Sequence, residues 1–67
     1  MYCVMVYYND LMYHDKEEFV GKTLRVNYLT DNHAHIFDSA NQPACFFKTR
    51  FVFFETFKQA EYYLYLG

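Results

Sequence analysis

The sequence predicts a single, mainly β domain of five short strands followed by a C-terminal helix. Short runs rich in β-branched and aromatic residues recur along the chain, and clusters of turn-forming residues separate them. Only the last stretch combines helical spacing of apolar residues with an N-cap pattern. We therefore place the strands within residues 1–55 and the helix at residues 56–66.

The first strand is predicted at residues 2–8, YCVMVYY. Both faces of this strand are apolar, so we expect it to be buried on two sides. Asn9 and Asp10 are turn-forming residues that end it. Residues 9–21 are rich in polar side chains and lack a sustained period, which predicts a long loop that ends in a sharp backbone turn at Gly21.

The middle of the chain is predicted to form two hairpins and a closing strand. Residues 23–29 alternate apolar and polar side chains, a Thr-Asp-Asn turn follows, and residues 33–39 supply the returning strand. A polar turn then leads to a strand at 44–47, one 3₁₀ turn at 48–50 and a last strand at 52–55. The side chains expected on the inner face of the first hairpin are Leu24, Val26, Tyr28, Ala34 and Ile36.

The tail TFKQAEYYLYLG is predicted to be helical. Thr56 followed three residues later by Gln59 is a capping-box pattern, and Gly67 is suited to end the helix. Because both sides of this helix are apolar, it needs more than one surface to pack against. One face carries Phe57, Ala60 and Leu64, with Tyr63 beside them, and the opposite side carries Tyr62, Tyr65 and Leu66.

Length and composition exclude several classes of protein. Two cysteines in 67 residues are too few for a disulfide scaffold, so we expect Cys3 and Cys45 to be buried thiols in a cytoplasmic protein. No apolar run reaches the roughly 18 residues that a membrane span needs. We therefore expect no membrane partner. The net charge of -2, with no block of basic residues, predicts that the protein does not bind duplex nucleic acid.

The aromatic content is the unusual property of this chain. Eight Phe and eight Tyr are more than so small a core can enclose. Neighbouring strand residues point to opposite faces, so one ring of Phe46 and Phe47, and one of Phe53 and Phe54, must face outward. Three explanations stay open: the C-terminal helix covers these rings, a second copy of the chain covers them, or a partner protein does.

Three side chains are candidates for a chemical role. His33 and His35 point to one face of a strand, as metal ligands would, but they lie beside a surface turn and are expected to be solvated. Cys45 with a histidine base would support an enzyme, whereas we expect a core cysteine. The prediction is a non-enzymatic protein with no catalytic residue, metal or cofactor.

The segment VGKTLRVNYLTDNHAHIFDSANQPACFFKTRFVFF, residues 20–54, carries a Val-Gly-Lys start, an alternating strand, an acidic turn, a strand that ends in Asp, and Lys-x-Arg-Phe before the last strand. In this pattern the chain resembles small bacterial and phage SH3-like proteins. The resemblance implies a five-stranded SH3-like barrel over residues 1–55, to which the helix at 56–66 is an addition. The matching positions are Val20, Gly21, Lys22, Asp38, Lys48, Arg50 and Phe51.

The resemblance also implies a mode of action. Many small proteins of this kind are encoded by phages or other mobile elements and cover a site on a host protein. In signalling SH3 domains a groove of aromatics that includes a Trp binds polyproline helices. Tyr7 and Tyr8 fall where groove tyrosines would lie, but the chain has no Trp, so polyproline binding is not expected.

The function predicted from these observations is an interaction module that binds and masks or inhibits a host macromolecule, as a homodimer. An alternative is an aromatic-lined oligomer that sequesters a small molecule such as a nucleotide, with Lys48 and Arg50 at its phosphates. The interface candidates are Tyr7, Tyr8, Tyr13, Phe54, Tyr62, Tyr65 and Leu66, and the rim charges are Lys48 and Arg50.

Overall fold

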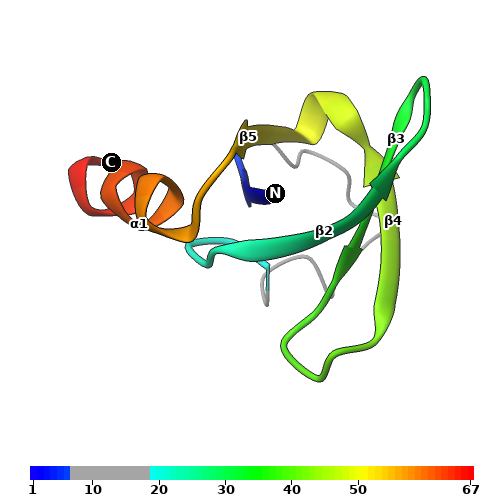
Figure 1. Ribbon diagram of the computed structural model, residues 1–67, viewed down its shortest axis with the longest axis horizontal. Helices are drawn as coiled ribbons and strands as arrows, with labels where there is room; N and C mark the ends of the chain where they lie inside the picture. The colour runs from blue at the N-terminus through cyan, green and yellow to red at the C-terminus, as the bar shows by residue number, and fades with distance from the viewer. Residues whose placement is uncertain (7–18) are drawn as a thin grey trace.

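The structure is a computed structural model that describes residues 1–6 and 19–67. In these residues five strands precede one α-helix, and a 3₁₀ turn lies between the last two strands (Figure 1). The elements are β1 (Tyr2–Met5), β2 (Leu24–Leu29), β3 (His33–Phe37), β4 (Pro43–Phe47), η2 (Lys48–Arg50), β5 (Phe51–Phe54) and α1 (Phe57–Leu66). The mainly β class, the 3₁₀ turn and the C-terminal helix are therefore confirmed.

All strand pairs are antiparallel and form one sheet in the order β4-β3-β2-β1-β5. Within the described residues no ladder joins β4 to β5, so the sheet is open at these two strands. The predicted first strand is observed as Tyr2–Met5, while residues 7 and 8 and loop residues 9–18 lie outside the described part of the chain. Among the described residues, no helix has the length and apolar character needed to cross a membrane.

The main core lies on the inner face of the curved sheet. Ala34 and Ile36 on β3 are both 0% exposed, as the alternation of that strand predicts. Phe46 and Phe53 are half-buried and pack against the same core from β4 and β5. The buried members of this core are Cys3, Met5, Phe19, Leu24, Ala34, Ile36 and Phe51.

β1 is buried on both faces, as its sequence predicts. Cys3 and Met5 point into the main core, whereas Val4 lies on the other face and is also buried. On that second face the register places Val4 beside Val52 and Tyr2 beside Phe54 of β5. Because α1 packs against β1 and β5, the helix covers this second apolar layer (Figure 1).

A β-bulge in β2 overturns one predicted position. Val26 pairs with Ile36, but Tyr28 pairs with His35, so the register shifts between them. An extra residue in one strand moves the following side chains to the opposite face. Tyr28 was expected to point inward with Leu24 and Val26; it lies instead on the outer face and is 52% exposed.

The turns have the chemistry that the sequence predicts. Gly21 has φ +77°, a conformation that residues with a Cβ adopt at a cost. In the β3–β4 turn the Asp38 carboxylate accepts hydrogen bonds from the backbone N–H of Ala40 and Gln42, at 2.9 and 2.8 Å. Asn41 completes this turn with φ 61°.

Ile36 provides a test of the main core. Its replacement by Ala should lower the free energy of unfolding by about 2–5 kcal/mol, because it leaves a cavity in a fully buried site, whereas Ile36→Val should cost about 0.5–1.5 kcal/mol. Urea denaturation followed by circular dichroism measures both changes. Equal costs for the two variants would contradict the packing described for this site.

Cys3 provides a second test, through pH. Burial raises the pKa of its thiol from 9.0 to about 12. The unfolded chain therefore loses this proton first, so the stability that the neutral thiol contributes is complete below pH 9.0 and is lost as the pH rises toward 12. Between about pH 9 and pH 11 the unfolding free energy should fall more steeply for the native chain than for Cys3→Ala, by at most about 1.4 kcal/mol per pH unit. Parallel slopes for the two proteins would show that the thiol does not titrate in this way.

Candidate functional site

The exposed side of α1 carries the three most exposed large apolar side chains of the described residues. Tyr62, Tyr65 and Leu66 are 61%, 86% and 66% exposed. Together with Lys58 they follow the i, i+4, i+7 and i+8 spacing of one helical face. We call these four residues the α1 outer face. An exposed apolar patch of this kind usually marks a surface that binds another molecule.

The opposite side of α1 fixes the helix to the domain. Ala60 is fully buried, and the Phe57 ring meets the Tyr2 ring edge-on at 5.6 Å between centroids. Tyr63 packs on Phe54 of β5 at 5.3 Å. The predicted face of Phe57, Ala60 and Leu64, with Tyr63 beside it, is therefore the face that contacts the sheet. The remaining side of the helix is left for the outer face.

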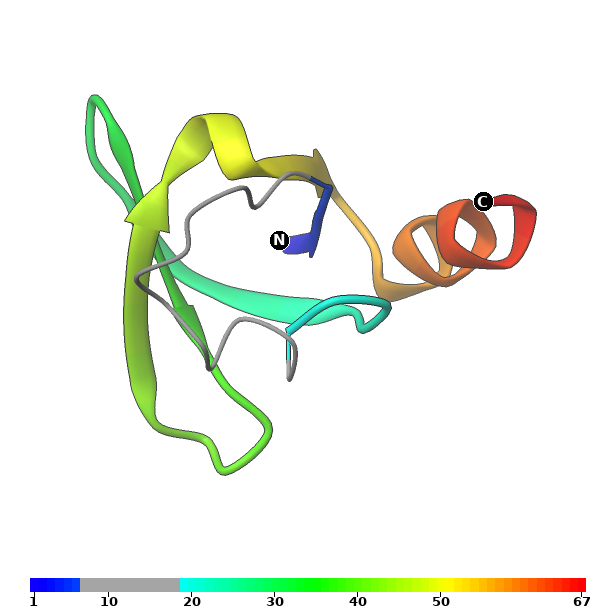
Figure 2. The ribbon, with the colours of Figure 1, turned by 180° about the vertical axis from the view of Figure 1, so that it is seen from behind.

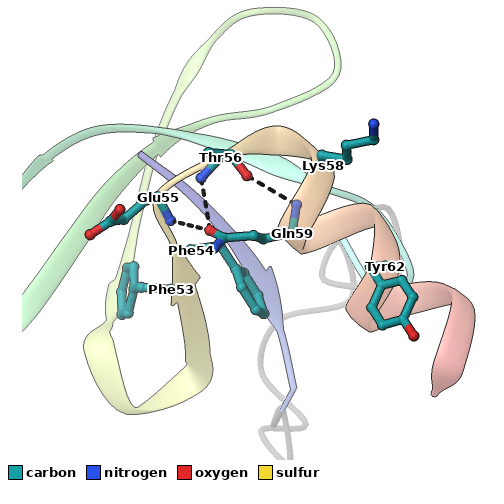
Figure 3. Close-up of a pocket in the computed structure, with 7 residues that line it drawn as sticks. All are labelled: Phe53, Phe54, Glu55, Thr56, Lys58, Gln59 and Tyr62. Carbon is teal, nitrogen blue, oxygen red and sulfur yellow. Dashed lines mark hydrogen bonds between the residues drawn. The ribbon is translucent and has the colours of Figure 1, made fainter.

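A complete capping box starts α1, as the sequence predicts. The Thr56 hydroxyl accepts a hydrogen bond from the Gln59 backbone N–H at 3.1 Å. The Gln59 side-chain oxygen accepts from the backbone N–H of Thr56 at 3.2 Å and of Glu55 at 3.1 Å (Figure 3). These bonds satisfy N–H groups that lack a partner within the helix. They fix the point at which the chain leaves β5 and thus the direction of the α1 outer face.

An open groove of about 820 Å³ lies beside the capping box. Figure 3 shows the Phe53 and Phe54 rings on one side of it, extending from β5, and Tyr62 on the helix. Lys58 places a positive charge at this groove, and Glu55 places a negative one. The groove is therefore lined by aromatic rings and has charged side chains at its edge. Lys58 and Tyr62 belong both to the groove and to the α1 outer face, so the two surfaces are continuous. Its lining residues are Phe53, Phe54, Glu55, Thr56, Lys58, Gln59 and Tyr62.

The structure brings some of the predicted interface residues together and separates others. Tyr62, Tyr65 and Leu66 share the α1 outer face, and Phe54 lies half-buried in the adjoining groove. The rim charges Lys48 and Arg50 are half-buried on η2 and do not line this groove. Tyr7, Tyr8 and Tyr13 lie outside the described residues.

Sequence reasoning missed several contributors to the groove, among them Phe53 and Lys58. The sequence identifies Phe53 and Phe54 as an adjacent pair of rings. That Phe53 lines the groove depends on the path of the chain from β5 into α1, which no local pattern predicts. Lys58 has a usable signal, because it is four residues before Tyr62 and so falls on the same helical face.

Cys45 corrects a prediction. It was expected in the core, but it is exposed on the outer face of β4, because its register neighbour is His35 rather than the inward-pointing Ala34 or Ile36. Cys3 is buried as predicted, and both cysteines are free thiols.

His33 and His35 are half-buried and form ring stacks rather than standing free in solvent. His33 stacks on Phe47 at 4.7 Å and His35 on Tyr28 at 4.1 Å between ring centroids. Within residues 1–6 and 19–67, no three His, Cys, Asp or Glu side chains are grouped so that they could hold a metal ion.

Comparison with models of protein families, with curated proteins and with solved structures found no match to this chain.

The capping box can be tested through the stability that it contributes. Thr56→Ala should lower the free energy of unfolding by about 1 kcal/mol, because the Gln59 backbone N–H at the start of the helix loses its hydrogen-bond acceptor. Thr49→Ala is the matched control, since Thr49 is an exposed threonine of η2 that makes no cap. Urea denaturation measures both variants, and an equal effect of the two would contradict the role given to Thr56.

Proposed function

We propose that this protein is a non-enzymatic interaction module that binds and masks a site on another protein with the α1 outer face. The observation that supports the proposal best is the exposure of Tyr62, Tyr65 and Leu66 on a helix whose other side is already occupied by the sheet. Tyrosine side chains are large and lose little conformational freedom on binding, so they commonly dominate the energy of interfaces.

The target in this proposal is a macromolecule of a host cell, met in the cytoplasm by a protein of a phage or another mobile element. A homodimer that shares the α1 outer face is part of the same proposal. Because Tyr62, Tyr65 and Leu66 lie on one helical face, a second copy or a partner protein can cover all three at once. Lys58 at the edge of this face favours a partner surface that carries an acidic group there.

The proposed architecture is a small SH3-like barrel extended by α1. The order of elements supports it: β1, a long connection, three hairpin-linked strands, one 3₁₀ turn and a final strand that returns to β1. β2 supports it further, because the strand pairs with β1 through Leu24 and Arg25 and with β3 through its later residues. A strand shared in this manner allows the sheet to curl around a single core.

The alternative function is sequestration of an aromatic small molecule such as a nucleotide. The groove beside α1 offers Phe53, Phe54 and Tyr62 for stacking, with the ammonium of Lys58 nearby for a phosphate. This arrangement assigns to Lys58 the role that is predicted from the sequence for Lys48 and Arg50. The retention of a nucleotide by the purified protein would favour this alternative.

The proposal is tested with the variant Tyr62→Ala/Tyr65→Ala. Native mass spectrometry and sedimentation velocity report the subunit number, and affinity capture reports bound proteins. Loss of two anchor residues should weaken self-association or capture at least about tenfold. The fold should persist, because both side chains point away from the sheet.

Tyr28→Ala is the matched control, since it removes a similarly exposed tyrosine from β2, away from α1. We expect it to associate as the native chain does. Association that stays the same in the double variant, with native circular dichroism, would rule out the α1 outer face as the binding surface.

A further inference from the structure

A row of three side chains crosses the outer face of the β2–β3–β4 sheet. Tyr28 of β2 pairs in register with His35 of β3, and His35 pairs with Cys45 of β4. Residues opposite each other in neighbouring strands project to the same face, so the three side chains stand side by side. We call Tyr28, His35 and Cys45 the outer row.

The outer row is accessible from solvent. The core side of β3 is occupied by Ala34 and Ile36, which are fully buried, and His35 between them projects to the other face. Cys45 and Tyr28 are exposed. A reagent in solution can therefore approach the thiol without any opening of the core.

Within the row a basic ring nitrogen adjoins the thiol. The Nε2 atom of His35 lies 3.7 Å from the Sγ atom of Cys45, within hydrogen-bond reach for sulfur. The His35 ring lies nearly parallel to the Tyr28 ring, at an interplanar angle of 12° and a centroid distance of 4.1 Å. Stacking of this kind restricts rotation of the imidazole and holds it beside Cys45. A thiol next to a positioned base is the arrangement from which a thiolate nucleophile forms.

The other cysteine, Cys3, differs from Cys45 in its environment. Cys3 is fully buried in the main core, where burial favours the neutral thiol over the thiolate. The folded chain therefore contains one accessible thiol with a neighbouring base and one enclosed thiol.

From this geometry we propose that Cys45 is a modification site that undergoes thiol–disulfide exchange with low-molecular-weight disulfides, with His35 as the proton acceptor. The Cys45 proton passes to Nε2 of His35, and the thiolate attacks one sulfur of the incoming disulfide. A new S–S bond to Cys45 forms as the S–S bond of the reagent breaks. The released thiolate takes the proton from the imidazolium, so the products are a mixed disulfide on Cys45 and one free thiol.

The modified surface lies apart from the α1 outer face. In Figures 1 and 2 the β3–β4 hairpin and α1 stand at opposite ends of the molecule. An adduct on Cys45 would cover the aromatic and imidazole rings of the outer sheet face and leave the helix free. The proposal is therefore independent of the function proposed for α1, and the two can fail separately.

The experiment uses dithiodipyridine, an uncharged disulfide whose released thione is followed by absorbance, with the adduct located by peptide mass spectrometry. We expect one adduct per folded chain, on Cys45, and none in Cys45→Ser. Replacement of His35 by Gln should slow the reaction about threefold or more, because the thiol loses its proton acceptor. The uncharged reagent ensures that a slower rate does not reflect lost attraction between reagent and imidazolium.

His33→Gln is the matched control. His33 lies on the same face of β3, but it pairs in register with Phe47 and stacks on that ring rather than lying beside Cys45. Its rate should equal that of the native chain. Labelling of Cys3 reports unfolding in any variant. If His35→Gln labels Cys3, Tyr28→Leu replaces it as the test, since it keeps the imidazole but removes the stack and should also slow the reaction.

Two outcomes overturn the proposal. One is an adduct on Cys3 rather than Cys45 in the folded native chain. The other is a folded His35→Gln protein, or a folded Tyr28→Leu protein where that variant is used, that reacts as fast as His33→Gln.

Discussion

The burial of β1 on both faces is the constraint on which the rest of the structure depends. Cys3 and Met5 close the main core, and Val4 lies in a second apolar layer under α1. A 67-residue domain buries only about 60% of the surface that its unfolded chain exposes, so it has little stability to spare. Placing one strand between two apolar layers increases the area removed from water per residue. Loss of either layer would expose one face of the strand that joins β2 to β5.

This arrangement answers the problem of the surplus aromatic residues in two different ways. Phe54 and Tyr2 face outward from the main core, and α1 covers them through Tyr63 and Phe57. Phe47 is 53% exposed and stacks on His33. One side of α1 packs on this second layer, and the opposite side, the α1 outer face, is exposed. The same element therefore stabilises the domain and carries the most exposed large apolar side chains of the described residues.

The sequence was sufficient to predict most of the fold. The alternation of Ala34 and Ile36, the Thr56–Gln59 capping box and the 3₁₀ turn are local patterns, and the structure confirms each of them. Tyr28 was placed on the wrong face because a bulge depends on pairing with β3, which no pattern within β2 encodes. The exposure of Cys45 was missed for a related reason: its hydrophobic neighbours suggested a core position, and only the register with His35 sets its face. The exposed side of α1 was predictable from helical periodicity, whereas the groove required the path from β5 into the helix.

The bulge between Val26 and Tyr28 divides β2 into two segments whose side chains alternate in opposite phase. Before the bulge, Val26 pairs with the core residue Ile36 of β3. After the bulge the alternation is reversed: Tyr28 pairs with His35 on the outer face, and Leu29 pairs with Ala34. Replacement of Tyr28 by another residue therefore leaves the core packing unchanged. The number of residues in the segment is under a different constraint. Loss or gain of a single residue here would exchange the environments of Tyr28 and Leu29, so variation in this strand is expected to change side chains and to preserve length.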